Sequence, residues 1–346
     1  MSTGTNPSMS IGERPHLSRW QLLGSSLIGL AILGLAVALI PAISDQPITF
    51  YLILILGTAG SLFYFIRYRK SHFASNNYRW TQALTTKGAS AWILGIVLTG
   101  FYVLVYWFPN VLQGWVRLVD PLSQWMRNSP ADHWFFYSLV YSWFVLVMGV
   151  RFVFKYRHSN YQIIRTISVV FFQLIIAFVL PQLLRMFQYP EFYFSYFWPL
   201  KYDYLFPSTL QAFWNDPRAL TQFMFFWCLI AIAIVTPVLT YFYGKRWYCS
   251  WVCGCGGLAE TAGDPFRHLS DNRLKAWQIE RWMVHGVLLL IVVVTAFLWA
   301  SFYFGFMPGP AGFLAEWYGF FIGAIFAGVI GIGFYPLLGN RVWCRF

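Results

Sequence analysis

Charged residues are scarce in this chain of 346 residues. Only 10% of the residues are Asp, Glu, Lys or Arg, whereas 58% are hydrophobic. Soluble globular chains carry about 25% charged residues, so the deficit excludes a soluble protein of this length. The apolar residues also form runs of about 20, which is long enough for a helix to cross a bilayer. No long segment is polar enough for a separate soluble domain, and we expect one all-α integral membrane domain.

Acidic side chains are missing from the middle of every apolar run. Proton pumps and ion-coupled transporters usually carry such a group, because a buried carboxylate serves as their relay or ion site. This absence argues against a transporter. The sequence also lacks a nucleophile paired with a general base, a phosphate-binding loop and a nucleic-acid recognition motif. We therefore expect neither a bond-making enzyme nor a nucleic-acid partner.

The apolar runs predict a bundle of about eight transmembrane helices. The first run exceeds the core of a signal peptide and lacks a clean cleavage pattern, so we expect it to be retained. The Pro308-Gly309-Pro310 segment is expected to break the chain before the last helix. The predicted helices are 20–43, 47–66, 89–107, 134–154, 164–184, 219–243, 282–304 and 318–338.

These helices divide the chain into four regions. An N-terminal tail (1–19) precedes a six-helix membrane region (20–243). A cysteine-containing loop (244–281) follows, and a two-helix region (282–346) ends in a second cysteine motif.

Basic residues are concentrated on one side of the predicted bundle. Nineteen of the 24 Lys and Arg residues fall at the two ends of the chain and in alternate loops, which include the cysteine loop. Positively charged loops stay in the cytoplasm, so both termini are predicted to be cytoplasmic. We expect a multi-pass protein of a bacterial-type inner membrane. Counting acidic residues, the cytoplasmic face carries about +14 and the outer face about −2. Anionic lipid and an acidic redox partner both suit such an inner face.

A six-residue repeat ends two of the predicted helices. The segments 244–249 and 339–344 both read glycine, any residue, arginine, any residue, aromatic residue, cysteine. Glycine permits a helix-terminating turn. Arg246 and Arg341 place positive charge close to Cys249 and Cys344, which favours the thiolate over the thiol. The repeat therefore predicts two reactive or metal-binding cysteines at equal membrane depth.

Four of the five cysteines are clustered in these motifs, namely Cys249, Cys253, Cys255 and Cys344. A helical turn would place Cys249 and Cys253 on one face, because they are four residues apart. The neighbouring glycines let backbone amides approach the sulfurs, and such amides stabilise a reduced iron–sulfur cluster. The four thiols are candidate ligands of a 4Fe-4S cluster. Zinc and copper are rivals, since both accept thiolates, and unligated cysteines are the simplest alternative.

Several other residues have two interpretations. Asp264 and Arg267 either brace the cysteine loop through an ion pair or belong to a docking surface or lid. His285 either contacts haem or a quinone or is a hydrogen-bonded packing residue. His133 lies on the opposite side, and no haem-binding histidine pair follows from the spacing. Cys228 lies alone within an apolar run and is interpreted as packing.

Residues 245–258 together with 341–346 resemble the membrane-bound polyferredoxin family. Its members serve nitrous oxide respiration, periplasmic nitrate reduction and cytochrome oxidase assembly, and carry two Cys-x-x-x-Cys-Pro motifs at cytoplasmic helix ends. Cys249 and Cys253 match the first motif, and Cys344 matches the start of the second. The resemblance covers about the last hundred residues and implies a cytoplasmic iron–sulfur cluster.

Three departures from that family stand out. Gly254 replaces the proline and is followed by the additional Cys255. The soluble ferredoxin domain that usually follows is missing. The sequence stops at Phe346, two residues short of the expected second cysteine, which favours a longer chain.

Together these features predict a membrane electron-transfer subunit. It would hold one 4Fe-4S cluster and exchange electrons between a cytoplasmic or quinol donor, or the quinone pool, and other subunits of a respiratory complex. Arg246 and Arg341 would tune the reduction potential by their charge. The alternatives are an assembly factor that handles copper or clusters, and a structural subunit of a membrane complex with inert cysteines.

Overall fold

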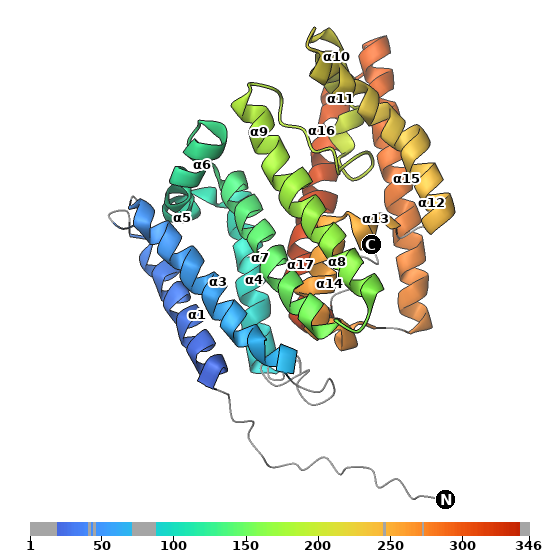
Figure 1. Ribbon diagram of the computed structural model, residues 1–346. Coiled ribbons are helices and arrows are strands. Elements are labelled where there is room, and N and C mark those ends of the chain that lie inside the picture. Colours follow the sequence, from blue (N-terminus) through green and yellow to red (C-terminus); the bar gives the residue numbers. More distant parts are fainter. Residues whose placement is uncertain are drawn as a thin grey trace, which may run out of the picture.

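The computed structural model describes residues 19–40, 43, 46–70, 88–244, 247–271 and 273–339, apart from the side chains of 66–70. Within these ranges the regular structure is entirely helical. Figure 1 shows the helices as an elongated bundle in which most long axes run in the same direction.

Eight helices in the described part of the chain are long and apolar enough to cross a membrane, which confirms the predicted number. Several of them are continuous through two or three consecutive helical elements. They are α1 (Arg19–Val37), α3 (Pro47–Lys70), α4 (Ala89–Trp107), α7 (His133–Lys155), α8 (Asn160–Phe171) to α9 (Leu180–Met186), α11 (Ala219–Ile230) to α12 (Thr236–Tyr243), α15 (Leu274–Phe304), and α16 (Pro308–Tyr318) to α17 (Gly331–Gly333).

Two helix starts lie eight or more residues before the predicted ones. Helix α15 begins at Leu274 instead of Trp282, and α16 begins at Pro308 instead of Tyr318. The break between them lies at Gly305 and Met307, which adopt positive φ angles of 64° and 47°. Proline fits the first turn of a helix, where its missing amide hydrogen costs nothing, so Pro308 starts α16 rather than interrupting it.

Three of the spans contain a π-helical stretch. These wider turns are η2 (Phe172–Val179), η4 (Ala231–Val235) and η6 (Gly319–Ile330). π-Helical turns are uncommon and occur frequently at functional sites. The first of them carries Gln173, which is fully buried beside the cysteine segment.

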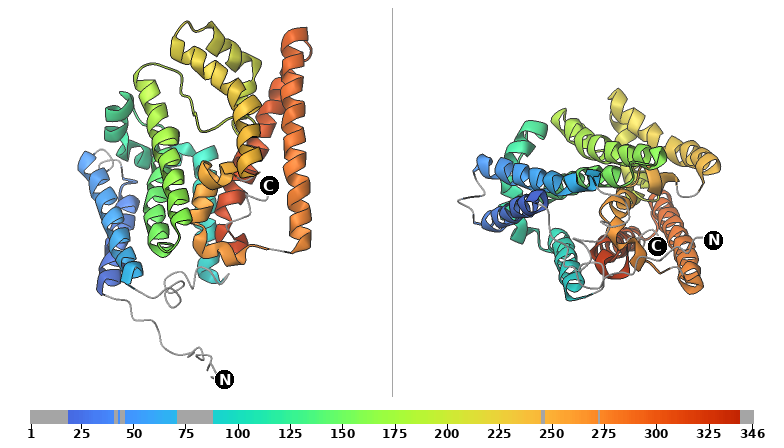
Figure 2. Two further views of the ribbon diagram at one scale, coloured as in Figure 1. Left: turned by 45° about the vertical axis from the view of Figure 1, so that its right-hand side comes forward. Right: turned by 60° about the horizontal axis from the view of Figure 1, so that its bottom comes forward.

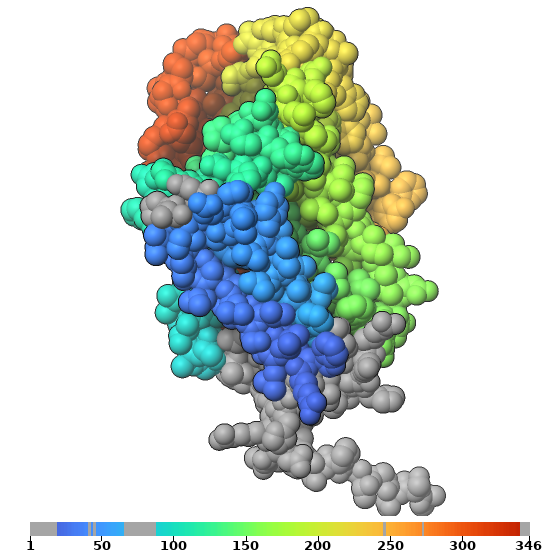
Figure 3. All heavy atoms as spheres, turned by 60° about the vertical axis from the view of Figure 1, so that its left-hand side comes forward, coloured from blue at the N-terminus to red at the C-terminus, as the bar shows by residue number. Residues whose placement is uncertain are grey.

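The α1–α3 hairpin packs against α7 at one side of the bundle (Figure 1). Gly24 and Gly60 allow α1 and α3 to approach closely, because a Cβ atom on either would overlap the backbone of the other helix. In Figure 3 the short helices α5 (Gln113–Leu118) and α6 (Asp120–Arg127) lie over one end of this hairpin. Trp115 of α5 donates a hydrogen bond of 2.7 Å to Leu35 O.

The cysteine segment does not form a peripheral loop. It folds into α13 (Trp247–Trp251), α14 (Gly254–Thr261) and the 3-10 helix η5 (Asp264–Leu269). Helix α14 packs against both α7 and α8, and α18 (Tyr335–Leu338) at the end of the last span packs against η5. Figures 1 and 2 show α13 and α14 enclosed by the surrounding long helices.

Candidate metal centre

The two copies of the sequence repeat begin with the same backbone conformation. Gly244 ends α12 with φ 82° and ψ 169°, and Gly339 ends α18 with φ 85° and ψ 168°. Side chains other than hydrogen are strongly disfavoured in this region. The prediction that each glycine ends a helix is confirmed, and the matching angles indicate that the two segments leave their helices in the same way.

The end of the second copy lies against the segment that follows the first. A Cβ atom on Gly339 would be 2.5 Å from Ser270 N and 2.8 Å from Ser270 Cα. A buried apolar cluster that includes Leu258, Phe266, Ile332 and Tyr335 joins α14 and η5 to the end of the last span. The chain therefore enters residues 340–346 from a position next to the cysteine segment.

The three cysteines that are candidate ligands within the described residues differ in how far they are buried. Cys253 is only 4% exposed, whereas Cys249 and Cys255 are half-buried. The Cys255 thiol hydrogen-bonds with Cys253 and, together with burial, raises the pKa of the Cys253 thiol well above its usual range. The backbone amides of Gly256 and Cys255 oppose this effect.

Glycine is required at positions 254, 256 and 257 by close packing. A Cβ atom at Gly256 would overlap the backbone carbonyl of Cys249, and one at Gly257 would overlap Val169 of α8. A Cβ atom at Gly254 would lie 2.6 Å from Gln173 Oε1 and 3.1 Å from Tyr196 Oη, and would overlap Tyr141 Oη. These glycines bring α14 against α7 and α8, and they fold the Cys249 backbone onto the start of α14.

A polar wall formed by Tyr141, Gln173 and Tyr196 faces Gly254. Gln173 Nε2 donates a hydrogen bond of 2.6 Å to Val252 O, and Tyr196 Oη donates one of 3.4 Å to Gln173 Oε1. The buried Tyr141 hydroxyl has no hydrogen-bond partner among the residues that the structure describes. A polar side chain within a membrane span costs free energy unless it has a polar partner or a function. Gln173 is therefore the residue of this wall that the sequence could have indicated.

An ion-pair network anchors the segment below the cysteines. The Asp264 carboxylate is 1% exposed and lies 2.6 Å from Lys155 Nζ, 3.7 Å from Arg151 and 3.7 Å from Arg267. Tyr156 Oη donates a hydrogen bond of 3.0 Å to it. The predicted Asp264–Arg267 pair is therefore present, but Lys155 and Arg151 of α7 are the more buried partners.

A second ion-pair group adjoins this network. Glu260 lies 2.8 Å from Arg165 and 2.6 Å from Arg267. Burial and the Asp264 charge raise the pKa of the nearby Tyr156 hydroxyl to about 12. Four cations and two carboxylates make up the two groups, so a net positive charge lies next to the cysteine segment.

The remaining candidates divide into three groups. Arg246, Arg341 and Cys344 lie outside the described residues. Cys228 is 1% exposed within an apolar cluster, in agreement with packing. His285 is exposed on α15, and His133 starts α7 with its ring 4.9 Å from that of Trp134.

The thiols do not converge on a common point within the described residues. No group of three or more His, Cys, Asp or Glu side chains there is arranged to hold a metal ion. The described cysteines nevertheless fit a thiolate-bound cluster in their surroundings: sulfur atoms near backbone amides, an unpaired buried hydroxyl and nearby cations all favour added negative charge.

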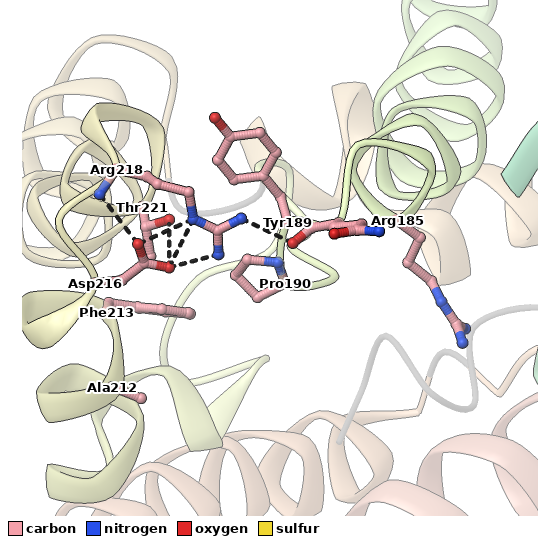
Figure 4. Close-up of a pocket in the computed structure, with 9 residues that line it drawn as sticks. Arg185, Tyr189, Pro190, Ala212, Phe213, Asp216, Arg218 and Thr221 are labelled. Carbon is pink, nitrogen blue, oxygen red and sulfur yellow. Dashed lines mark hydrogen bonds and ion pairs between the residues drawn. The ribbon is translucent and has the colours of Figure 1, made fainter.

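A cavity of about 480 Å³ lies at the opposite end of the bundle, next to α10 (Pro207–Asn215). Arg218 forms hydrogen bonds with Asp216 and Gln188 O and stacks over Tyr189, as Figure 4 shows. The bonds from Arg218 lower the pKa of the Asp216 carboxyl to about 2. Because these charges are already paired, the cavity offers no evident ligand chemistry.

Comparison with known proteins identifies one family. Residues 224–273 match the family described as a 4Fe-4S binding domain. The matched part runs from the middle of α11 through α13, α14 and η5, and it includes Cys249, Cys253 and Cys255. No curated protein and no solved structure matches the chain. The match supports an iron–sulfur family, and with the eight apolar helices it fits a membrane iron–sulfur electron-transfer protein.

Proposed function

We propose that the protein is a membrane electron-transfer subunit that carries one 4Fe-4S cluster and exchanges electrons with a respiratory partner complex or the quinone pool. The observation that carries the proposal is the match of residues 224–273 to a 4Fe-4S binding domain. We also propose that the protein is of the polyferredoxin type. Cys249 and Cys253, together with the start of the second motif, support this part of the proposal. Such a cluster would supply one-electron chemistry when bound.

Cys249, Cys253, Cys255 and Cys344 are the proposed ligands. Cys253 and Cys255 already touch, and the Gly256 packing holds Cys249 against the start of α14. The fourth ligand would come from the second repeat copy, which leaves α18 next to Ser270. Arg246 and Arg341 would tune the potential by their charge, and packing against α7 and α8 would exclude water from the buried side of the site.

Iron and acid-labile sulfide measured on anaerobically purified protein test the proposal. We expect about four of each per chain and a resonance after reduction, both lost in Cys253→Ser and reduced or altered in Cys344→Ser. Cys228→Ser is the matched control, since Cys228 is buried in a different cluster. A wild-type protein without iron and sulfide would overturn the proposal, and full occupancy with an unchanged spectrum in Cys344→Ser would remove the second copy from the site.

A copper-handling assembly factor is the second candidate. The contact between the Cys253 and Cys255 thiols favours it, because two soft sulfur ligands are suited to Cu(I). Copper content without visible absorption or a reduced-state resonance would support this alternative over the cluster.

A further inference from the structure

Position 254 has no room for a side chain, so a proline would not fit there. Gly254 lies between two candidate ligands, Cys253 and Cys255. A side chain here would collide with the polar wall, whose hydroxyl and amide oxygens crowd the Gly254 α-carbon. The absence of a Cβ atom thus lets side chains from α7, η2 and the 187–206 segment approach the backbone between the two cysteines.

The three members of the wall are not equivalent. Gln173 is occupied by Val252 O, and Tyr196 donates to Gln173. Of these three residues, only Tyr141 has a buried side-chain oxygen without a hydrogen-bond partner in the described part of the chain. Leaving a buried hydrogen-bond donor without an acceptor costs about 1–3 kcal/mol. A hydroxyl held in this position therefore indicates an acceptor that belongs to a bound group and not to the polypeptide.

The acceptor must lie on the cysteine side. The Tyr141 hydroxyl lies against Gly254, the residue between Cys253 and Cys255. Its ring is packed against Tyr137, with ring centroids 6.0 Å apart, which restricts its hydroxyl to the region of Gly254. Tyr137 Oη lies 3.4 Å from Tyr102 Oη, so these two hydroxyls are hydrogen-bonded to each other.

We propose that Tyr141 is a positioning residue whose hydroxyl donates a hydrogen bond to a sulfur atom of a cluster bound beside Cys253 and Cys255, and that the lack of a side chain at Gly254 makes room for it. This inference rests on the proposed function. Reduction adds negative charge to the sulfurs, and a hydrogen-bond donor stabilises the form with more negative charge. Tyr141 therefore raises the reduction potential of the centre.

Redox titration of the intact, anaerobically purified protein tests this role. Tyr141→Phe removes only the hydroxyl, and we expect the equilibrium constant for reduction to fall about tenfold, which is ~59 mV for one electron. Tyr137→Phe is the matched control, because it lies one helical turn away and its hydroxyl already has a partner. Its potential should stay at the wild-type value.

A substitution with the opposite sign guards against a purely structural effect. Introducing 3-fluorotyrosine at position 141 makes the hydroxyl a stronger donor with nearly the same shape, so the potential should rise. Equal potentials in wild type, Tyr141→Phe and the fluorotyrosine protein, with full iron content in wild type, would overturn the role of Tyr141 alone. A wild-type protein that holds no iron or sulfide would overturn the proposed function and this inference with it.

Discussion

At the scale of single residues, contacts around the cysteines come from positions far apart in the sequence. Gln173 reaches Val252 across 79 residues, and Lys155 reaches Asp264 across 109. The sequence indicated the cysteines and the Asp264–Arg267 pair, because those residues are close neighbours in the chain. Tyr141 and Arg151 could not be predicted, since nothing local distinguishes them from other aromatic or basic residues near a membrane helix.

Asp264 should be among the most sensitive carboxylates in the chain. Removing the Asp264 carboxylate leaves the buried cations Lys155 and Arg151 of α7 without this counter-ion. Breaking a buried ion pair costs about 3–5 kcal/mol. We expect Asp264→Ala to lower the thermal stability of the detergent-solubilised protein and its bound iron. Asp271→Ala is the control, because the exposed Asp271 only accepts a 2.9 Å hydrogen bond from Arg273 N and should change stability by less than about 0.5 kcal/mol. Similar losses in the two variants would contradict the anchoring role.

At the scale of helices, the apolar runs located all eight spans, but the polar ends of the helices were harder to place. Helix α15 extends to Leu274 because residues such as Lys275 and Arg281 continue the helix outside the apolar run. Polar residues are compatible with helix once the backbone has left the hydrocarbon, so hydropathy marks the bilayer and not the helix. The prediction of one helical turn through Cys249 and Cys253 is wrong, because α13 ends at Trp251 and Cys253 has an extended backbone. The division into α13 and α14 depends on packing against α7 and α8, which is a tertiary effect.

The two repeat glycines provide a comparison between otherwise similar helix ends. Both adopt a backbone conformation that only glycine favours, so alanine at either position should cost about 1–3 kcal/mol. Gly244 has open space around it, whereas Gly339 touches the backbone of Ser270. We therefore expect Gly339→Ala to destabilise the protein more than Gly244→Ala in thermal unfolding, and to separate α18 from η5. Equal destabilisation would mean that the Ser270 contact adds nothing.

Asp132 gives the N-terminal end of α7 a pH dependence. Burial of its carboxyl opposes ionisation, but the Phe135 amide and Arg127 outweigh that effect and lower its pKa. A lowered pKa stabilises the fold above the ordinary value of about 3.9, and this contribution is lost as the pH falls through the folded-state pKa. Wild-type stability should therefore fall more steeply between pH 5 and 3 than that of Asp132→Asn, since asparagine caps the helix without titrating.

Thermal unfolding of both proteins across this pH range measures the difference directly. Asp132→Ala at pH 7 should cost about 1 kcal/mol, the usual value of an N-cap. Parallel pH profiles for wild type and Asp132→Asn would show that the carboxylate contributes no pH-dependent stability.

At the scale of the whole molecule, the sequence assigns more basic residues to one end of the bundle than to the other. Arg117 belongs to α5, Arg127 to α6 and Arg185 to α9, and these helices are labelled above α14 in Figure 1. Lys155, Arg165 and Arg267 belong to the other end, where the cysteine segment is anchored. The bias in basic residues predicts that this second end faces the cytoplasm.

Labelling with a membrane-impermeant maleimide in intact cells tests this orientation. Gln124→Cys places a thiol on an exposed position of α6, and Asp271→Cys places one on an exposed position after η5. Because nineteen of 24 basic residues are assigned to the cysteine-loop side, we expect Gln124→Cys to react in intact cells and Asp271→Cys to react only after permeabilisation. The wild-type protein controls for its own cysteines, of which Cys228 and Cys253 are buried. The reverse pattern would place the cysteine segment on the outer side, and a cytoplasmic electron donor could then not reach it.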